Sequence, residues 1–143
     1  MSKERMDLVA PCGMDCGICE LYTCRTNVRL FSALTLRGIP EEKIPCEGCR
    51  SVEGNCPVIP EKCETFKCVQ EKKVEFCYEC SDFPCEKLQP SSKRADVLPH
   101  NMKVFNLCKI RRDGVERFTE KSSEIKQRYY AGIIEIGKGP QLQ

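Results

Sequence analysis

The chain has 143 residues, 31% of them charged and 41% apolar, and its 23 basic and 21 acidic side chains leave a formal net charge of +2. This length favours one domain with a core of its own. The near balance of charge gives no indication of nucleic-acid or membrane-surface binding. The sequence has no apolar run of the length of a signal peptide or membrane span, so we expect a cytoplasmic protein with no membrane partner.

The cysteine content is the unusual feature, with 13 cysteines in the chain. In a secreted protein this density would indicate a disulfide scaffold, but an odd count leaves at least one thiol unpaired in a fully disulfide-bonded form. Cysteines at short, repeated spacings in a cytosolic chain are more typical of metal ligands. We therefore prefer metal binding over disulfides.

Residues 11–40 are expected to hold an N-terminal cysteine cluster followed by a helix. From 17 to 37, side chains of one face recur at three- and four-residue steps: Leu21, Cys24, Val28, Phe31 and Leu34. This period predicts an amphipathic helix ended by Gly38 and Pro40, with Asp15 as the residue that caps its start.

The cluster itself, "PCGMDCGIC" at 11–19, has the C-x3-C-x2-C spacing of radical S-adenosylmethionine enzymes. Those enzymes build an incomplete α/β barrel around their cluster. No alternating strand–helix pattern follows Cys19, and Ile18 stands where they usually place an aromatic residue. We therefore exclude that class.

Residues 41–90 hold eight of the 13 cysteines and few large apolar side chains, which follow no long period. Such a segment cannot bury enough apolar area to offset its ordering entropy unaided. A structural zinc site supplies about 10–16 kcal/mol of apparent folding free energy at neutral pH. We therefore predict a small α-rich single domain over residues 1–143, with an irregular cysteine-rich, metal-stapled centre.

A helical pair is expected over residues 100–132. Asn101 is predicted to cap the first helix, which runs to about Asp113 and is followed by Gly114 in the C′ position. The apolar stripes of the two helices are Val104, Phe105, Leu107 and Cys108, then Val115, Phe118, Ile125 and Tyr129. Residues 89–100 have the composition of a linker, and the tail 133–143 is expected to form a short strand or an extended arm.

The strongest metal-binding signals are the two C-x2-C pairs at 46/49 and 77/80. Such a pair lies on a tight turn that directs both sulfurs at one ion, and Gly48 suits the left-handed position that the turn needs. One grouping places Cys46, Cys49, Cys63 and Cys68 in one site, and Cys77, Cys80 and Cys85 with Cys12 or Cys16 in the other. The spacing alone leaves this grouping open.

Zinc is the preferred metal, as one or two ions, with an iron–sulfur cluster as the alternative. Tetrahedral four-sulfur sites suit either zinc or iron. The common ferredoxin spacings are absent, which favours zinc. Metal-free thiols and a dithiol redox site remain further alternatives, the latter requiring an exposed C-x2-C pair with a low pKa.

The remaining chemistry-bearing residues have structural interpretations. Cys24 and Cys108 fall on apolar stripes and are expected to pack as small hydrophobes. Cys19 and Cys56 suit either role, and His100, the single histidine, suits a structural role before a helix more than that of a ligand or base. No catalytic constellation is apparent, so we lean towards a protein that is not an enzyme.

Four stretches together resemble a family of small cysteine-rich proteins common in anaerobic bacteria and archaea: "CGMDCGIC", "CEGCR", "CETFKC" and "EFCYECSDFPCEKL". That family is catalogued only as a domain of unknown function, and "LPHNMKVFNLCKI" and "IGKGP" are similar to its recurrent ending. The resemblance implies one compact, metal-binding domain and a recurrent framework of Cys12, Cys16, Cys46, Cys49, Cys63, Cys68, Cys77, Cys80 and Cys85. It implies no activity, so the leading hypothesis is a zinc-stapled binding or adaptor module with an unidentified protein partner.

Overall fold

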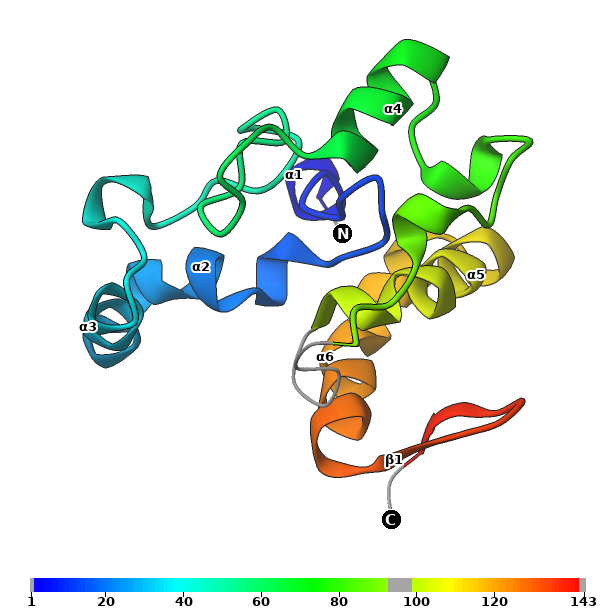
Figure 1. The fold of residues 1–143 in the computed structure, drawn as a ribbon. Coiled ribbons are helices and arrows are strands. Elements are labelled where there is room, and N and C mark those ends of the chain that lie inside the picture. Colours follow the sequence, from blue (N-terminus) through cyan, green and yellow to red (C-terminus); the bar gives the residue numbers. More distant parts are fainter. Residues whose placement is uncertain (1, 93–98, 142–143) are drawn as a thin grey trace.

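Helices dominate the computed structural model, which describes residues 2–92 and 99–141 (Figure 1). In these residues the α-helices are α1 (Lys3–Met6), α2 (Glu20–Thr23), α3 (Val28–Leu36), α4 (Glu64–Lys72), α5 (Lys103–Asp113) and α6 (Val115–Ala131). The 3-10 helices are η1 (Cys16–Ile18), η2 (Cys24–Thr26), η3 (Glu41–Lys43), η4 (Cys77–Glu79), η5 (Glu86–Leu88) and η6 (Pro99–Met102). With about 54% helix, the α-rich prediction is confirmed. No helix in the described residues is long and apolar enough to cross a membrane.

The single helix expected over 17–37 is wrong. The segment is divided into η1, α2, η2 and α3, because the backbone is extended at Cys19 (φ −73°, ψ 138°) and at Asn27 (φ −141°, ψ 98°). The Asn27 side chain accepts a hydrogen bond from the Leu30 N–H at 3.0 Å. A side chain that caps a new helix competes with continuation of the previous one, so Asn27 restarts the helix.

The C-terminal helical pair is confirmed, with two corrections. Gly114, at φ 88°, makes the corner between α5 and α6. Asn101 lies within η6, where its side chain bonds to the backbone of Ser91, and the N-cap of α5 is Met102. Cys108 is exposed, because α5 buries Leu107 and Ile110 and successive helical residues point about 100° apart.

The tail forms a hairpin in which β1 (Ile133–Glu135) pairs with β2 (Gly139–Gln141) antiparallel. This confirms the expected strand. Half of the linker expected at 89–100 falls on residues 93–98, which lie outside the described residues. The centre, expected to be irregular, contains one α-helix, α4, which buries Thr65 and Val69.

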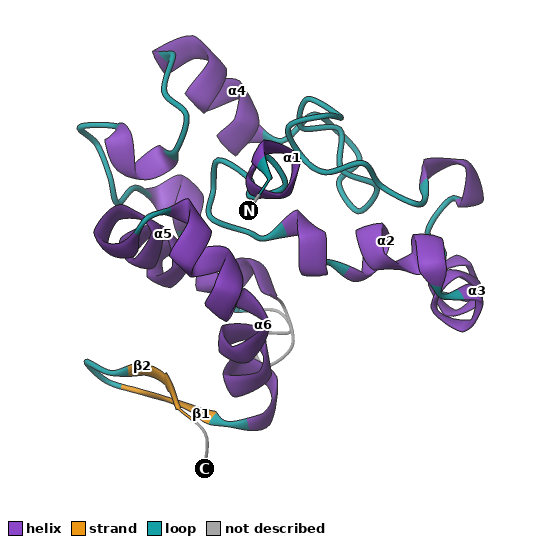
Figure 2. Ribbon diagram, turned by 180° about the vertical axis from the view of Figure 1, so that it is seen from behind, coloured by secondary structure: helices purple, strands orange, loops and turns teal. Residues whose placement is uncertain are grey.

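Two groups of elements flank the N-terminal segment. Figure 1 shows α2 and α3 on one side, α5 and α6 on the other, and α1 between them, and Figure 2 shows the same order from behind. The larger core lies on the α5–α6 side and contains Val9, Ala10, Cys12, Cys16, Phe76, Leu88, Leu107, Ile110 and Phe118. The smaller core lies on the α2–α3 side and contains Leu21, Cys24, Leu34, Ile44 and Cys46. Buried cysteines therefore belong to both cores.

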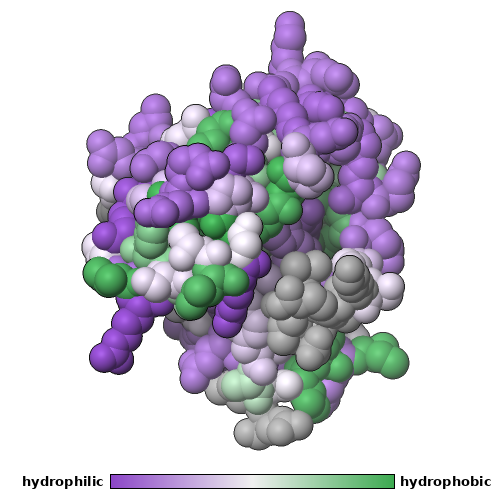
Figure 3. All heavy atoms as spheres, turned by 60° about the vertical axis from the view of Figure 1, so that its left-hand side comes forward, coloured by the Kyte–Doolittle hydropathy of each residue, from purple (hydrophilic) through white to green (hydrophobic). Residues whose placement is uncertain are grey.

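Among the described residues, the exposed large apolar side chains lie mainly on α3 and on the C-terminal hairpin. The face in Figure 3 is mostly hydrophilic, with small separate apolar groups. The large apolar residues that are exposed include Val28 and Leu36 on α3 and Ile134 on β1. Isolated exposed apolar residues are normal on a folded protein.

A buried carboxylate joins the N-terminal loop to α1 and α6. Asp15 is 4% exposed and forms a two-point ion pair with Arg5, with N···O distances of 2.8 and 2.6 Å. The Ser122 hydroxyl of α6 donates to the same carboxylate at 2.6 Å, and the Gly17 N–H donates at 2.9 Å. The last contact confirms Asp15 as a cap, here of η1.

We expect Asp15→Asn to lower the free energy of unfolding by about 3 kcal/mol, because it leaves the Arg5 guanidinium without its anion in a partly buried place. Urea denaturation followed by circular dichroism measures this. The matched control is Glu64→Gln, which removes an exposed ion pair with Lys67 and is expected to leave the midpoint near that of wild type. Equal midpoints for the two variants would contradict the role given to Asp15.

Candidate metal centre

The loop 8–16 brings two cysteines to different parts of the molecule. It folds back on itself: the Ala10 N–H donates to the Met14 carbonyl at 2.8 Å, and the Cys16 N–H donates to the Leu8 carbonyl at 2.9 Å. Cys12 and Cys16 are therefore both held by a closed loop. Both are buried.

Arg50 fixes this loop to the central segment. Its Nε donates to the Val9 carbonyl at 2.9 Å and its Nη2 donates to the Glu75 carbonyl at 3.0 Å. The guanidinium also lies 4.9 Å from the ring centroid of Phe76. Arg50 is a positioning residue that the sequence analysis did not identify, although it directly follows Cys49 in "CEGCR".

Cys16 meets the first C-x2-C turn. Its sulfur lies 3.4 Å from the Cys49 sulfur, and the Cys49 N–H donates to it at 3.5 Å. The hydrogen bond with Cys49 lowers the pKa of Cys16, and the same contact, followed by burial, raises the pKa of Cys49. The two sulfurs are therefore in direct contact and influence each other's ionisation.

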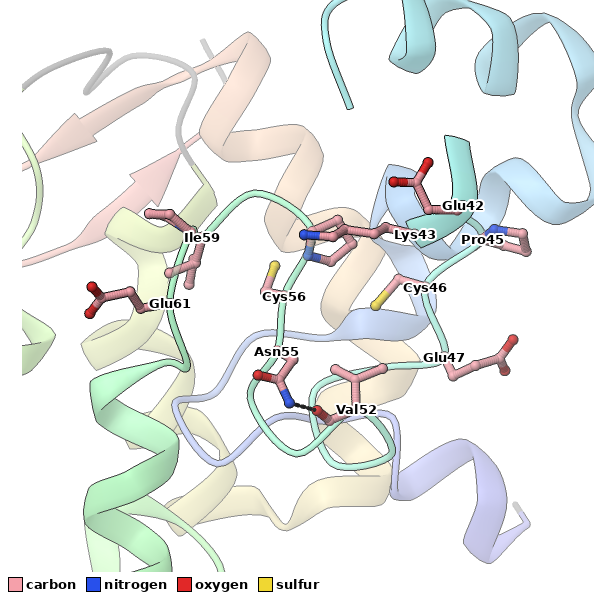
Figure 4. A pocket seen from close by; sticks show the side chains of 12 residues that line it. Glu42, Lys43, Pro45, Cys46, Glu47, Val52, Asn55, Cys56, Ile59 and Glu61 are labelled. Carbon is pink, nitrogen blue, oxygen red and sulfur yellow. Dashed lines mark hydrogen bonds between the residues drawn. The ribbon is translucent and has the colours of Figure 1, made fainter. Parts of the chain in front are cut away.

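Cys46 and Cys56 lie near this pair. Burial is the main cause that raises the pKa of both thiols. The charge of Cys16 adds to this for both, and the charge of Cys46 adds to it for Cys56. Both side chains line a cleft of about 420 Å³, and Figure 4 shows them on facing parts of its wall. We refer to Cys16, Cys46, Cys49 and Cys56 as the first thiol set.

A second thiol set is formed by Cys12, Cys68, Cys77 and Cys85. Burial raises the pKa of Cys77 to about 12, with further contributions from the charges of the other three thiols. The Cys77 N–H donates to the Pro11 carbonyl at 2.9 Å, which ties η4 to the loop that carries Cys12. Cys68, Cys77 and Cys85 also line a common cleft of about 500 Å³.

The structure thus groups the candidate ligands differently from the grouping considered above. Cys16 joins the first C-x2-C pair, and Cys12 joins Cys77 and Cys85. Cys63 is assigned to neither set, since its charge contributes to the raised pKa of both Cys12 and Cys56. Cys80 lies apart, within 3.0 Å of Lys72. Cys56, which spacing left ambiguous, lies with the first set.

The cysteines outside both sets differ in their surroundings. Cys24 is buried and donates to the Leu21 carbonyl at 3.3 Å, as expected for a packed thiol. Burial raises the pKa of Cys19 to about 12. His100, on η6, is half-buried, and burial followed by the charge of Lys103 lowers its pKa.

Several cysteines have a backbone amide two residues further on that stabilises the thiolate. The amides of Met14, Gly48 and Val58 lower the pKa of Cys12, Cys46 and Cys56, against the larger effect of burial. Turns of this kind let backbone N–H groups bond to thiolates while both sulfurs of a C-x2-C pair point at one ion. Two such turns, Cys12–Met14 and Cys46–Gly48, carry one member of each thiol set.

The donor chemistry of both sets fits a thiophilic metal. Soft thiolates are the ligands of zinc and of iron–sulfur clusters, and each set offers four of them. Within the described residues, however, no three Cys, His, Asp or Glu side chains are already arranged as a complete binding group.

These features define a helical, cysteine-rich protein whose N-terminal loop carries Cys12 and Cys16. The chain belongs to the DUF3795 family, described as a protein of unknown function, whose family model matches residues 8–90. That span contains both thiol sets. No curated protein and no solved structure matches the chain.

Gly48 has a positive φ of 99°, as expected, and a Cβ there would lie 3.0 Å from Leu8 Cδ2. We expect Gly48→Ala to lower the free energy of unfolding by at least about 1 kcal/mol more than Gly38→Ala does. Gly38 has a similar φ of 96° but open space around it, so it carries the backbone strain without the contact. Thermal unfolding of the two variants would show equal losses if the Leu8 contact were unimportant.

Proposed function

We propose that this chain is a two-centre zinc–thiolate protein that acts as a binding or adaptor module for another protein. The first thiol set would hold one zinc ion and the second set another. Bound zinc would cross-link segments that lie far apart in the sequence. Four protein thiolates complete a tetrahedral coordination sphere, and such closed sites are structural ones.

The observation that carries this proposal is the separation of 3.4 Å between the Cys16 and Cys49 sulfurs. Two thiolates bound to one tetrahedral zinc at about 2.3 Å stand about 3.8 Å apart. The two sulfurs are therefore close to the spacing of one mononuclear site. In a [4Fe–4S] cluster each thiolate binds a different iron, so its cysteine sulfurs stand further apart. The contact thus supports a mononuclear site over the cluster.

The shortage of apolar side chains in residues 41–90 supports the same role. The buried residues of this segment are few, and they include Ile44, Val69, Phe76 and Leu88. The ordering entropy of the long loops between them needs another source of free energy. Metal binding at both sets would supply this free energy. A site that exists only in the folded chain binds metal only there, so its binding free energy stabilises the fold.

Elemental analysis and a visible spectrum of protein purified without oxygen test the metal. We expect about two zinc ions per chain and no visible absorption, because zinc has a filled d shell. Iron with equimolar sulfide and a brown colour would replace the proposal with the iron–sulfur alternative. Protein that binds neither metal would overturn both.

Single serine variants test the two sets. Cys46→Ser and Cys77→Ser are each expected to lower the zinc content from about two ions to about one, because each removes a thiolate from a different closed site. Cys24→Ser and Cys108→Ser are the matched controls and are expected to retain both ions. Equal zinc content in all four variants would contradict the assignment of ligands.

A further inference from the structure

Cys80 forms a cluster with two charged side chains outside both thiol sets. The Lys72 Nζ lies 3.0 Å from the Cys80 sulfur and 2.7 Å from the Asp82 carboxylate. The Asp82 N–H also donates to the Cys80 sulfur, at 3.3 Å. The sulfur therefore receives an ammonium donor from α4 and an amide donor from its own turn.

The cluster opens into the cleft of the second thiol set. Cys80, Lys72 and Asp82 line that cleft together with Cys77. Glu71, Glu86 and Lys87 are the other charged residues of its wall. A small molecule that enters this cleft can therefore reach Cys80.

The electrostatics of Cys80 are opposite to those of its neighbour. The ammonium of Lys72, followed by the Asp82 amide, lowers the pKa of Cys80, and the Asp82 carboxylate opposes this only weakly. Burial raises the pKa of Cys77 to about 12. Both thiols of this C-x2-C pair are half-buried, and Cys80 is the one that receives the Lys72 ammonium and the Asp82 amide, so we expect it to be the more reactive of the two.

We propose that Cys80 is a modification site, a reactive thiolate that Lys72 and the Asp82 amide hold ready for hydroperoxides and soft electrophiles, with Cys77 as its disulfide partner. The site lies outside the proposed metal ligands except for Cys77. Its reactivity does not depend on bound metal. The effect of the Cys77–Cys80 disulfide on zinc binding does rest on the proposed function.

In the first step the Cys80 sulfur attacks one oxygen of the hydroperoxide. A sulfur–oxygen bond forms, the oxygen–oxygen bond breaks, and the leaving oxygen takes a proton from the Lys72 ammonium. The products are a Cys80 sulfenic acid and water, or an alcohol where the hydroperoxide is organic. The thiolate is oxidised by two electrons and the peroxide is reduced by two.

In the second step the Cys77 sulfur attacks the Cys80 sulfenic acid. The sulfur–oxygen bond breaks, and hydroxide leaves as water with the proton of the Cys77 thiol. The turn is suitably short, because the Cys80 N–H donates to the Cys77 carbonyl at 3.1 Å. Turns of this kind keep their end Cα atoms within about 7 Å, the upper limit of disulfide geometry. Since Cys77 belongs to the second thiol set, the disulfide would withdraw one ligand from it.

Iodoacetamide labelling of the full chain at pH 7, read by peptide mass spectrometry, tests the reactivity. We expect Cys80 to be alkylated about tenfold faster than Cys108, which is exposed and has no lysine bonded to its sulfur in the contacts described. Lys72→Gln is expected to reduce the Cys80 rate to that of Cys108, and Lys72→Arg to retain most of it. Equal rates for the two cysteines in wild type, or an unchanged rate in Lys72→Gln, would overturn the proposal.

Hydrogen peroxide treatment tests the disulfide and separates this proposal from the metal assignment. In peptide mass spectrometry, wild type is expected to show a Cys77–Cys80 linkage that is two hydrogen masses lighter than the reduced peptide, and Cys80→Ser is expected to leave Cys77 unlinked. Peroxide that leaves this linkage unformed in wild type would overturn the pairing. The labelling rates remain measurable in protein without zinc, so failure of the metal proposal would show in the elemental analysis alone. In zinc-loaded protein, the same oxidation is expected to release one of the two ions.

Discussion

The loop that carries Cys12 and Cys16 is the constraint on which the arrangement of the molecule depends. It contributes one thiol to each set, and it is held by charge rather than by apolar packing alone. Asp15 ties it to α1 and α6 through Arg5 and Ser122, and Arg50 ties it to the central segment. In each of these hydrogen bonds one partner is charged, and such charge-assisted bonds are stronger than bonds between neutral groups.

Burial of the thiols explains why a metal would matter to this protein. Desolvation raises the pKa of several thiols, and it raises the pKa of the half-buried Cys19 and Cys77 to about 12. A thiophilic cation reverses this balance, because its charge stabilises the thiolates that burial disfavours. The sulfurs of Cys16 and Cys49, which are 3.4 Å apart, are the pair on which the proposed first zinc site is based. Cys80 differs because a lysine already supplies the positive charge.

The sequence predicted local elements well where one apolar periodicity or one glycine turn was enough to specify them. Gly114 made the corner between α5 and α6, the α6 stripe faced the core, and Gly48 took a positive φ. It failed where one residue interrupted a regular pattern. Asn27 restarted a helix that periodicity alone continued, and Cys108 turned outward because the buried face of α5 was set by its neighbours in the fold.

The sequence by itself therefore determined the helical class, the cysteine-rich centre and the turn at Gly48. These follow from short-range periodicity, capping and spacing, which act within a few residues. Only the tertiary structure decided which cysteines meet, because Cys16 and Cys49 are brought together by a loop and an arginine that spacing does not describe. It also decided that Cys80 faces Lys72 instead of other thiols, since the position of α4 against η4 is a property of packing. Contacts between distant segments depend on the whole fold, and no local pattern encodes them.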